Sequence, residues 1–170
     1  MSLIALVGLP NSGKTALFNT LTKNNQRVAN FPGITVEKKF GKAKLDEGHM
    51  DVVDLPGVYT LDASTLDEKV TRDYILNKRK EEKADVFALV VDSTNLRKSL
   101  YLALQIRDLG QKFVVALNMM DIAEKRGLKL DVEKLSEALG ATVVPTVAYD
   151  KVGAKRLMDA CVAERSKPEK

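Results

Sequence analysis

Residues 8–15 read GLPNSGKT, and no other feature limits the possible folds of this chain so strongly. They follow the apolar run 3–7 and precede Ala16-Leu17-Phe18, so we expect a strand to turn into a helix through them. The octet fits GxxxxGK[ST], a loop whose glycines let successive backbone N–H groups point at phosphate oxygens. The following helix presents its positive N-terminal end to the same anion. This order predicts an α/β fold with a phosphate-binding loop.

Short apolar runs alternate with amphipathic runs along the rest of the chain. We expect strands at 3–7, 36–45, 49–53, 86–92, 113–118 and 141–145, and helices at 14–22, 66–79, 98–109, 131–139 and 153–165. The runs 86–92 and 113–118 are apolar at nearly every position, which is typical of buried parallel strands. Glu47-Gly48 predicts a hairpin between 36–45 and 49–53. The predicted fold is α/β, with a six-stranded, mostly parallel sheet, one antiparallel edge hairpin and helices on both faces.

The composition indicates a folded chain of one domain. The 170 residues suffice for one domain, expected at 1–165, with a polar tail at 166–170. Apolar residues make up 45%, which excludes a disordered chain, and no apolar run approaches the roughly 20 residues that span a bilayer. Cys161 is the only cysteine, so we expect it in the core of a protein from a reducing compartment. The net charge of +4 is explained by lysines on solvated faces, and we expect no nucleic-acid partner.

The candidate binding residues follow the predicted strands. In a parallel sheet of this kind, ligands bind beyond the carboxyl ends of the strands. For the phosphates we expect contacts from the phosphate loop and the first helical residue: Gly8, Leu9, Pro10, Asn11, Ser12, Gly13, Lys14, Thr15 and Ala16. Within this loop Lys14 would reach the β- and γ-phosphates, and the Thr15 hydroxyl would coordinate Mg²⁺.

Two further segments fit roles around the terminal phosphate. Asp54-Leu55-Pro56-Gly57 fits DxxG, in which Asp54 would hold Mg²⁺ through water and the Gly57 N–H would contact the γ-phosphate. Asp and Gly are also ordinary turn residues, so this motif alone is weak. Gly33-Ile34-Thr35 lies between the two motifs, where a threonine that closes on Mg²⁺ in the triphosphate state is expected.

Two segments after the last strands fit a guanine base. Asn118-Met119-Met120-Asp121 is similar to NKxD, with Met119 in place of the lysine as cover for the base. Asp121 can accept hydrogen bonds from guanine N1–H and its amine, and polar discrimination of this kind reaches ~10⁴-fold against other bases. The alternative is a plain helix cap. After the final strand, the Ala148 N–H can donate to guanine O6, whereas Val147 lacks the hydroxyl usual at its position.

With these motifs in order, the chain resembles Ras-like GTPases, and more closely the N-terminal G domain of the ferrous iron transport protein B family. The resemblance covers nearly all of 3–155 through NSGKTALFNTLT, RVANFPGITVEKK, DLPGVYTL, RDYIL, VVDSTNLRKSLYLALQIRDLG and VVALNMMDIAEKRG. It implies GTP and GDP as ligands, and a fragment of a protein that continues into helical and transmembrane regions. It also implies a place on the cytoplasmic face of the inner membrane, oligomers formed through the membrane part, and regulation of ferrous iron uptake.

The resemblance also implies a mechanism. Val58 and Tyr59 stand where many GTPases carry a glutamine, so catalysis would rest on positioning and charge, with Asn11, Lys14, Thr35 and Gly57 as the catalytic residues. The family implies that Asn11 ligates K⁺; the alternative is an Asx-type hydrogen bond within the loop. The metal ligands would be Thr15, Thr35, Asp54 and Asn11, and the nucleotide-sensitive segments 26–38 and 54–75. The expected activity is slow, potassium-stimulated GTP hydrolysis; the alternatives are a ribosome- or RNA-associated GTPase and a non-hydrolysing switch.

Overall fold

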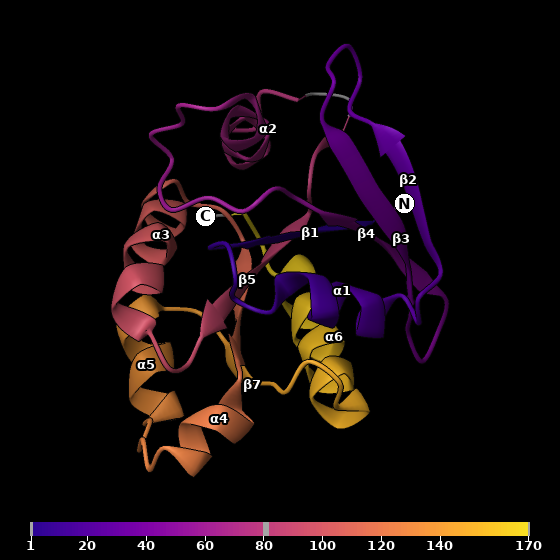
Figure 1. The fold of residues 1–170 in the computed structure, drawn as a ribbon. Helices are drawn as coiled ribbons and strands as arrows, with labels where there is room; N and C mark the ends of the chain where they lie inside the picture. Colours follow the sequence, from indigo (N-terminus) through magenta and orange to yellow (C-terminus); the bar gives the residue numbers. More distant parts are fainter. Residues whose placement is uncertain (1, 80–81, 170) are drawn as a thin grey trace.

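The computed structural model describes residues 2–79 and 82–169 (Figure 1). Its strands are β1 Leu3–Gly8, β2 Gln26–Asn30, β3 Glu37–Lys44, β4 His49–Asp54, β5 Val86–Asp92, β6 Phe113–Asn118 and β7 Val143–Pro145. Its helices are α1 Lys14–Leu21, α2 Leu66–Ile75, α3 Leu96–Asp108, α4 Met120–Lys125, α5 Val132–Leu139 and α6 Lys151–Arg165. Met1 and Lys170, at the ends of the expected domain and tail, lie outside the described residues.

One sheet contains all of these strands in the order β2-β3-β4-β1-β5-β6-β7. Strands β4, β1, β5, β6 and β7 are parallel, whereas β3 is antiparallel to both β2 and β4. The predicted hairpin is confirmed, since Lys44 pairs with His49 across its turn. The expected α/β architecture with a mostly parallel sheet is therefore confirmed.

The strand count differs from the prediction, because the sheet has seven strands and not six. The additional strand is β2, and all five of its residues are exposed. A strand that buries neither face shows no apolar alternation in its sequence. Its backbone hydrogen bonds to β3, from Gln26 opposite Gly41 to Asn30 opposite Glu37, form it at the edge of the sheet. The antiparallel edge is thus one strand wider than expected.

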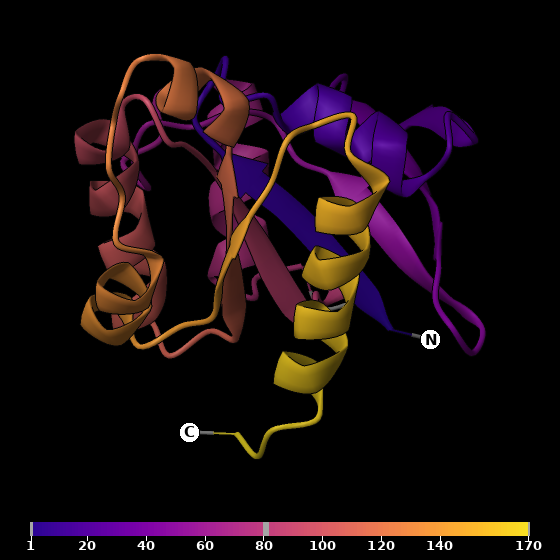
Figure 2. The ribbon, with the colours of Figure 1, turned by 90° about the horizontal axis from the view of Figure 1, so that it is seen from below.

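Helices cover both faces of the sheet, as predicted. Helices α1 and α6 pack on one face through a core that includes Phe18, Leu157 and the strand residue Leu6. Helices α2, α3 and α5 pack on the other face, where Tyr74 and Leu102 meet the core. Figure 2 shows α1 and α6 on one side of the strands, and α3 and α5 on the other. Strand β6 and the first six residues of β5 are fully buried, as expected of parallel strands covered on both faces.

The helix ends follow local signals in the sequence. Thr65 caps α2 by accepting a hydrogen bond from Glu68 N, and Asp131 caps α5 in the same way. Helix α2 ends at Ile75, four residues before the predicted end at 79, and Asn77 after it adopts a left-handed backbone (φ 55°). The six-residue helix α4 was not predicted, because it is too short for a periodic pattern.

Cys161 lies in the core between α6 and the sheet, as the sequence predicts. Burial, and to a lesser extent the carboxylate of Glu164, raise the pKa of its thiol to about 12. At pH 8 the thiolate fraction is then on the order of 10⁻⁴, so we expect no reaction with a disulfide reagent in the folded protein within minutes. Absorbance after addition of the reagent would measure this, with the unfolded chain as a reactive control. Rapid labelling without denaturant would contradict it.

Candidate functional site

The predicted binding segments meet at the carboxyl edge of the parallel strands. Leu6 of β1 pairs with Asp54, Asp92 of β5 pairs with Asn118, and Leu117 of β6 pairs with Pro145. Loop contacts extend this edge, because Val58 N donates to Gly8 O at 3.0 Å. The phosphate loop therefore lies next to three segments that are distant in the chain: DLPG at 54–57, NMMD at 118–121, and Thr146-Val147-Ala148 after β7.

The backbone of the phosphate loop requires glycine at two positions. A Cβ atom at Gly13 (φ 83°) would lie 2.3 Å from Nδ2 of Asn118, and one at Gly8 would lie 2.7 Å from the carbonyl oxygen of Val90. Helix α1 begins at Lys14, and no side chain caps it. Its first N–H groups therefore remain available to an anion. Ser12 Oγ is buried without a hydrogen-bond partner among the described residues, so one more donor lies in the loop.

Asn118, the first residue of the NKxD-like segment, makes two hydrogen bonds within the protein. Its Nδ2 donates to Ser12 O at 3.1 Å, and its Oδ1 accepts from Thr146 Oγ1 at 3.0 Å. The side chain is completely buried, so both polar ends are used within the protein. Asn118 therefore joins the phosphate loop to the segment after β7. The motif gave its position, but only the fold shows these two partners.

Lys14 and Asp54 form an ion pair with each other. From the sequence we expected Lys14 at the phosphates and Asp54 at a magnesium-bound water. Both side chains are almost buried, and two opposite charges removed from water are stabilised by direct contact. In this structure the two residues therefore neutralise one another, and a bound phosphate would compete with Asp54 for Lys14.

The segment Leu55-Pro56-Gly57 packs directly on the phosphate loop. A Cβ atom at Gly57 would lie 3.0 Å from Pro10 N, so the two backbones approach closely there. Leu55 is buried in the core, and its N–H donates to Leu6 O at 3.1 Å. The DLPG segment is thus held against the phosphate loop at Gly57.

The loop with Thr35, residues 31–36, which we call the Thr35 turn, lies away from the phosphate loop. It forms the turn between β2 and β3, at the top of Figure 1 and away from the segment that joins β1 to α1. Phe31 N donates to Val36 O at 2.9 Å, which closes the turn. Thr35 is exposed, and within 2–79 and 82–169 no hydrogen bond connects its side chain to the phosphate loop. Gly33 and Ile34 lie in the same turn, so the structure does not bring these three residues to the phosphate site.

The guanine-reading candidates have unused polar groups. Asp121 is exposed in the first turn of α4, after Met119 with a left-handed backbone (φ 61°). Thr20 Oγ1 of α1 donates to Ala148 O at 2.5 Å, which fixes the segment with Val147 beside α1. Among the described residues neither the Asp121 carboxylate nor the Ala148 N–H has a hydrogen-bond partner. An acceptor and a donor thus remain available at this end of the site.

Comparison with known proteins decides the family. The family model described as "Ferrous iron transport protein B" matches residues 2–161. The chain belongs to this family. Among curated members, it is 43% identical over 171 aligned positions to the Fe(2+) transporter FeoB of Legionella pneumophila (strain Lens), covering 97% of this chain and 22% of the relative. It is 46% identical over 149 positions to that of Escherichia coli (strain K12), covering 85% of this chain and 19% of the relative.

Solved structures of the family share the fold. The cytosolic domain of T. maritima FeoB in GDP form I superposes with a TM-score of 0.93 at 42% identity, over 99% of this chain and 65% of that one. Its GMPPNP form gives the same TM-score and identity, over 99% and 66%. An S. thermophilus NFeoB mutant bound to mGDP gives 0.86 at 44% identity, over 95% and 60%. The chain spans about a fifth of the curated relatives' length and about two thirds of these solved chains.

Metal ligation by carboxylates and imidazoles alone has no basis in the described part of the chain. Residues 2–79 and 82–169 contain no group of three or more His, Cys, Asp or Glu side chains arranged to hold an ion. In the same residues, every helix falls short of the length and apolarity needed to cross a bilayer.

Proposed function

We propose that this FeoB-family chain is a G domain that binds GTP and GDP and hydrolyses GTP slowly, with stimulation by potassium. The observation that carries the proposal is the meeting of an uncapped phosphate loop with the Asp121 and Ala148 groups at one sheet edge. The T. maritima domains solved in GDP and GMPPNP forms support guanine nucleotides as the ligands.

In this proposal the loop 8–16 and the first turn of α1 bind the phosphates through backbone N–H groups. Lys14 leaves Asp54 and contacts the β- and γ-phosphates, which frees the Asp54 carboxylate. Gly57 donates its N–H to the γ-phosphate from its position against Pro10. Asp121 accepts from the guanine N1–H and amine, Ala148 donates to O6, and Met119 covers the base.

Mg²⁺ and K⁺ fit the residues at hand. Thr15 and Asp54 offer hydroxyl and carboxylate oxygens, the donors that Mg²⁺ prefers, and the Lys14–Asp54 contact places Asp54 beside the start of α1. Asn11 is exposed with a left-handed backbone (φ 65°), and its side chain has no hydrogen-bond partner in 2–79 or 82–169. When bound, such ions neutralise charge that develops on the phosphate oxygens. Thr35 would join the Mg²⁺ ligands after its turn moves.

We further propose that residues 1–165 form the G domain and that 166–170 begin a connection to helical and transmembrane regions of a longer protein. The names of the relatives, Fe(2+) transporter FeoB, support a role in regulating ferrous iron uptake at the cytoplasmic face of the inner membrane. The short share of those relatives that the chain spans supports further regions, through which the whole protein would form oligomers.

Potassium stimulation is tested with Asn11→Ala. We expect the wild-type chain to hydrolyse GTP at least tenfold faster in potassium than in sodium buffer, because a fixed cation can replace an arginine finger worth 10³- to 10⁵-fold. In Asn11→Ala the ratio of the two rates should fall to about one. Phosphate release with GTP, and with ATP in parallel, measures both effects.

Asn24→Ala is the matched control, since Asn24 is also exposed with a left-handed backbone (φ 60°) but lies after α1, away from the loop. An unchanged potassium response in Asn11→Ala would overturn the ion assignment. Hydrolysis of ATP at the GTP rate would overturn the guanine assignment. GDP binding without turnover in either buffer would instead identify a non-hydrolysing switch.

A further inference from the structure

Five side chains form a half-buried cluster around one carboxylate, outside the site described above. Glu82 forms an ion pair with Lys38 of β3 through Oε1. Its Oε2 accepts a hydrogen bond from the Tyr74 hydroxyl at 2.5 Å and lies 3.7 Å from Nε of Arg79. Phe31 completes this group, which we call the Glu82 cluster. It joins the start of the Thr35 turn, strand β3, the end of α2 and the segment before β5.

The aromatic half of the cluster is equally well defined. Phe31 is buried and meets Tyr74 edge to face, with ring centroids 5.8 Å apart and planes at 72°. The guanidinium of Arg79 lies 5.4 Å from the Phe31 ring and 5.5 Å from the Tyr74 ring. Lys38 Nζ lies 6.0 Å from the Phe31 ring. Aromatic burial and charge pairing therefore act on the same few side chains.

The charges in the cluster are compatible with this arrangement at neutral pH. Burial alone would raise the pKa of Glu82, but hydrogen bonds from Lys38 and Tyr74 outweigh it and lower that pKa. Burial, followed by the Glu82 contact, raises the pKa of Tyr74. Glu82 is thus an anion that accepts a hydrogen bond from the protonated hydroxyl of Tyr74. Its removal would leave the partly buried cations Lys38 and Arg79 without their partner.

The Glu82 cluster includes residues of both segments that we expect to respond to nucleotide, 26–38 and 54–75. Phe31 and Lys38 stand on either side of the turn with Thr35, so the cluster fixes both ends of that turn. On α2, one helical turn before Tyr74, Thr71 Oγ1 donates to Pro56 O at 2.7 Å. Pro56 belongs to the DLPG segment that packs on the phosphate loop. Helix α2 therefore contacts the DLPG segment through Thr71 and the Thr35 turn through Tyr74.

We propose that Glu82 is a positioning residue that holds the Thr35 turn against α2, away from the phosphate site, until a nucleoside triphosphate draws it across. This inference rests on the proposed GTP binding. A triphosphate gains contacts with Thr35 only when the turn leaves α2, whereas a diphosphate offers no γ-phosphate to attract it. The cluster therefore opposes binding of the triphosphate selectively, and its loss shifts the turn toward the bound position.

The test uses the full 170-residue chain with Glu82→Gln and, as a second variant, Tyr74→Phe. Glu82→Gln removes the charge, and Tyr74→Phe keeps the ring on Phe31 but removes the hydroxyl. Affinities for fluorescent GMPPNP and fluorescent GDP are measured by titration. We expect GMPPNP to bind roughly five- to tenfold more tightly to both variants, with GDP affinity unchanged. Asp159→Asn, which removes a carboxylate from the exposed Lys155–Asp159 pair on α6, should change neither affinity.

Amide hydrogen exchange without nucleotide gives an independent readout. Residues 26–36 should exchange roughly tenfold faster in Glu82→Gln than in the wild type, and equally in Asp159→Asn. A GMPPNP affinity that falls or stays constant in both variants would overturn the proposal, as would unchanged exchange in 26–36. If the wild-type chain binds neither nucleotide, the proposed function fails by itself, and the exchange rates alone decide whether Glu82 holds the turn.

Discussion

Gly13→Ala is expected to reduce GDP affinity by about 100-fold or more. The new Cβ would lie 2.3 Å from Nδ2 of Asn118, so one of the two residues must move. Asn118 cannot move freely, because its side chain holds Ser12 O and Thr146 Oγ1 in the buried interior. The phosphate loop therefore shifts, and a displacement of about 1 Å in a positioned site costs on the order of 10² in function. Calorimetric titration with GDP measures the loss.

Gly48→Ala is the control for backbone strain. Gly48 has almost the same φ (81° against 83°), but a Cβ there meets nothing within 4 Å. Both substitutions therefore carry the left-handed penalty of roughly 1–2 kcal/mol, and only Gly13→Ala adds the collision. We expect Gly48→Ala to bind GDP like the wild type. Equal GDP affinities in the two variants would show that the contact with Asn118 does not shape the loop.

Asp121→Asn is expected to lower guanine nucleotide affinity by roughly 10³- to 10⁴-fold, the range in which an unmatched polar contact discriminates between ligands. In the proposed site the carboxylate would accept two hydrogen bonds from guanine, whereas an amide would present an NH₂ group to the amine of guanine. Xanthine carries a carbonyl in place of that amine, so the same variant should gain affinity for xanthosine diphosphate. Competition between the two diphosphates in one assay measures this exchange of preference.

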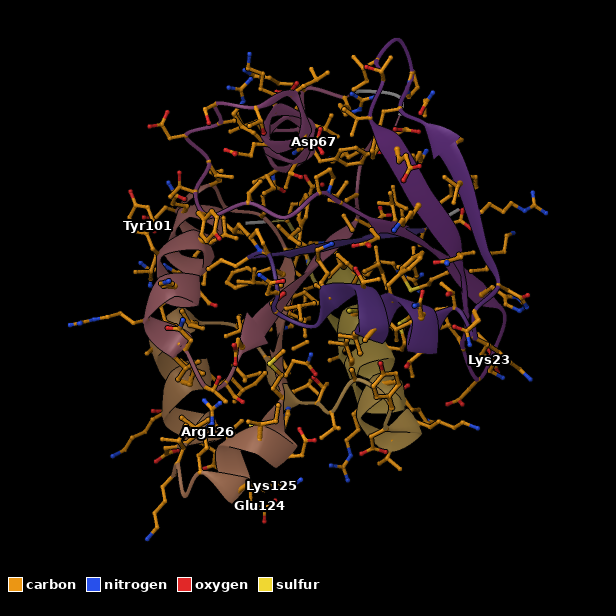
Figure 3. All side chains as sticks on the ribbon, in the orientation of Figure 1. Lys23, Asp67, Tyr101, Glu124, Lys125 and Arg126 are labelled. Atoms are coloured by element: carbon orange, nitrogen blue, oxygen red, sulfur yellow. The ribbon has the colours of Figure 1, made fainter. Side chains whose placement is uncertain are left out.

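Glu124→Gln is the matched control for Asp121→Asn. Glu124 is an exposed carboxylate on the same helix, and Figure 3 shows it directed away from the strands at the outer side of α4. The two substitutions remove the same charge from α4, so a general electrostatic effect would appear in both. Retained guanine preference in Asp121→Asn would contradict the role of Asp121 in reading the base.

The paired state of Lys14 and Asp54 bears on how the proposed nucleotide site would operate. A phosphate that binds Lys14 must first separate two nearly buried opposite charges. Released Asp54 then becomes available to a cation at the same moment as Lys14 turns to the phosphate. In the proposed site, cation and nucleotide binding would be coupled, since each would stabilise the side chain that the other frees.

Most of the architecture could be predicted from local patterns. Strands 86–92 and 113–118 have the predicted bounds, because burial on both faces leaves a continuous apolar signature. Asp131 and Thr65 mark helix starts because their side chains accept from backbone N–H groups three residues ahead. The order of the motifs, and their positions directly after strands, could be predicted from residue types and apolar runs in the sequence.

Other features depend on partners distant in the chain. Strand β2 has no apolar period, and exists because β3 offers it a free edge. Local sequence patterns likewise do not pair Lys14 with Asp54 or Lys38 with Glu82, because the partners are 40 and 44 residues apart.

The sequence by itself determined the phosphate loop and the parallel sheet, and it predicted that Asp121 reads guanine, because each rests on residue types at short, fixed spacing. Only the tertiary structure decided that Asn118 joins two loops, that Lys14 contacts Asp54 and that the Thr35 turn rests against α2. The physical reason is that ion pairs and buried hydrogen bonds form between whichever groups the fold brings together, and spacing along the chain does not encode that proximity.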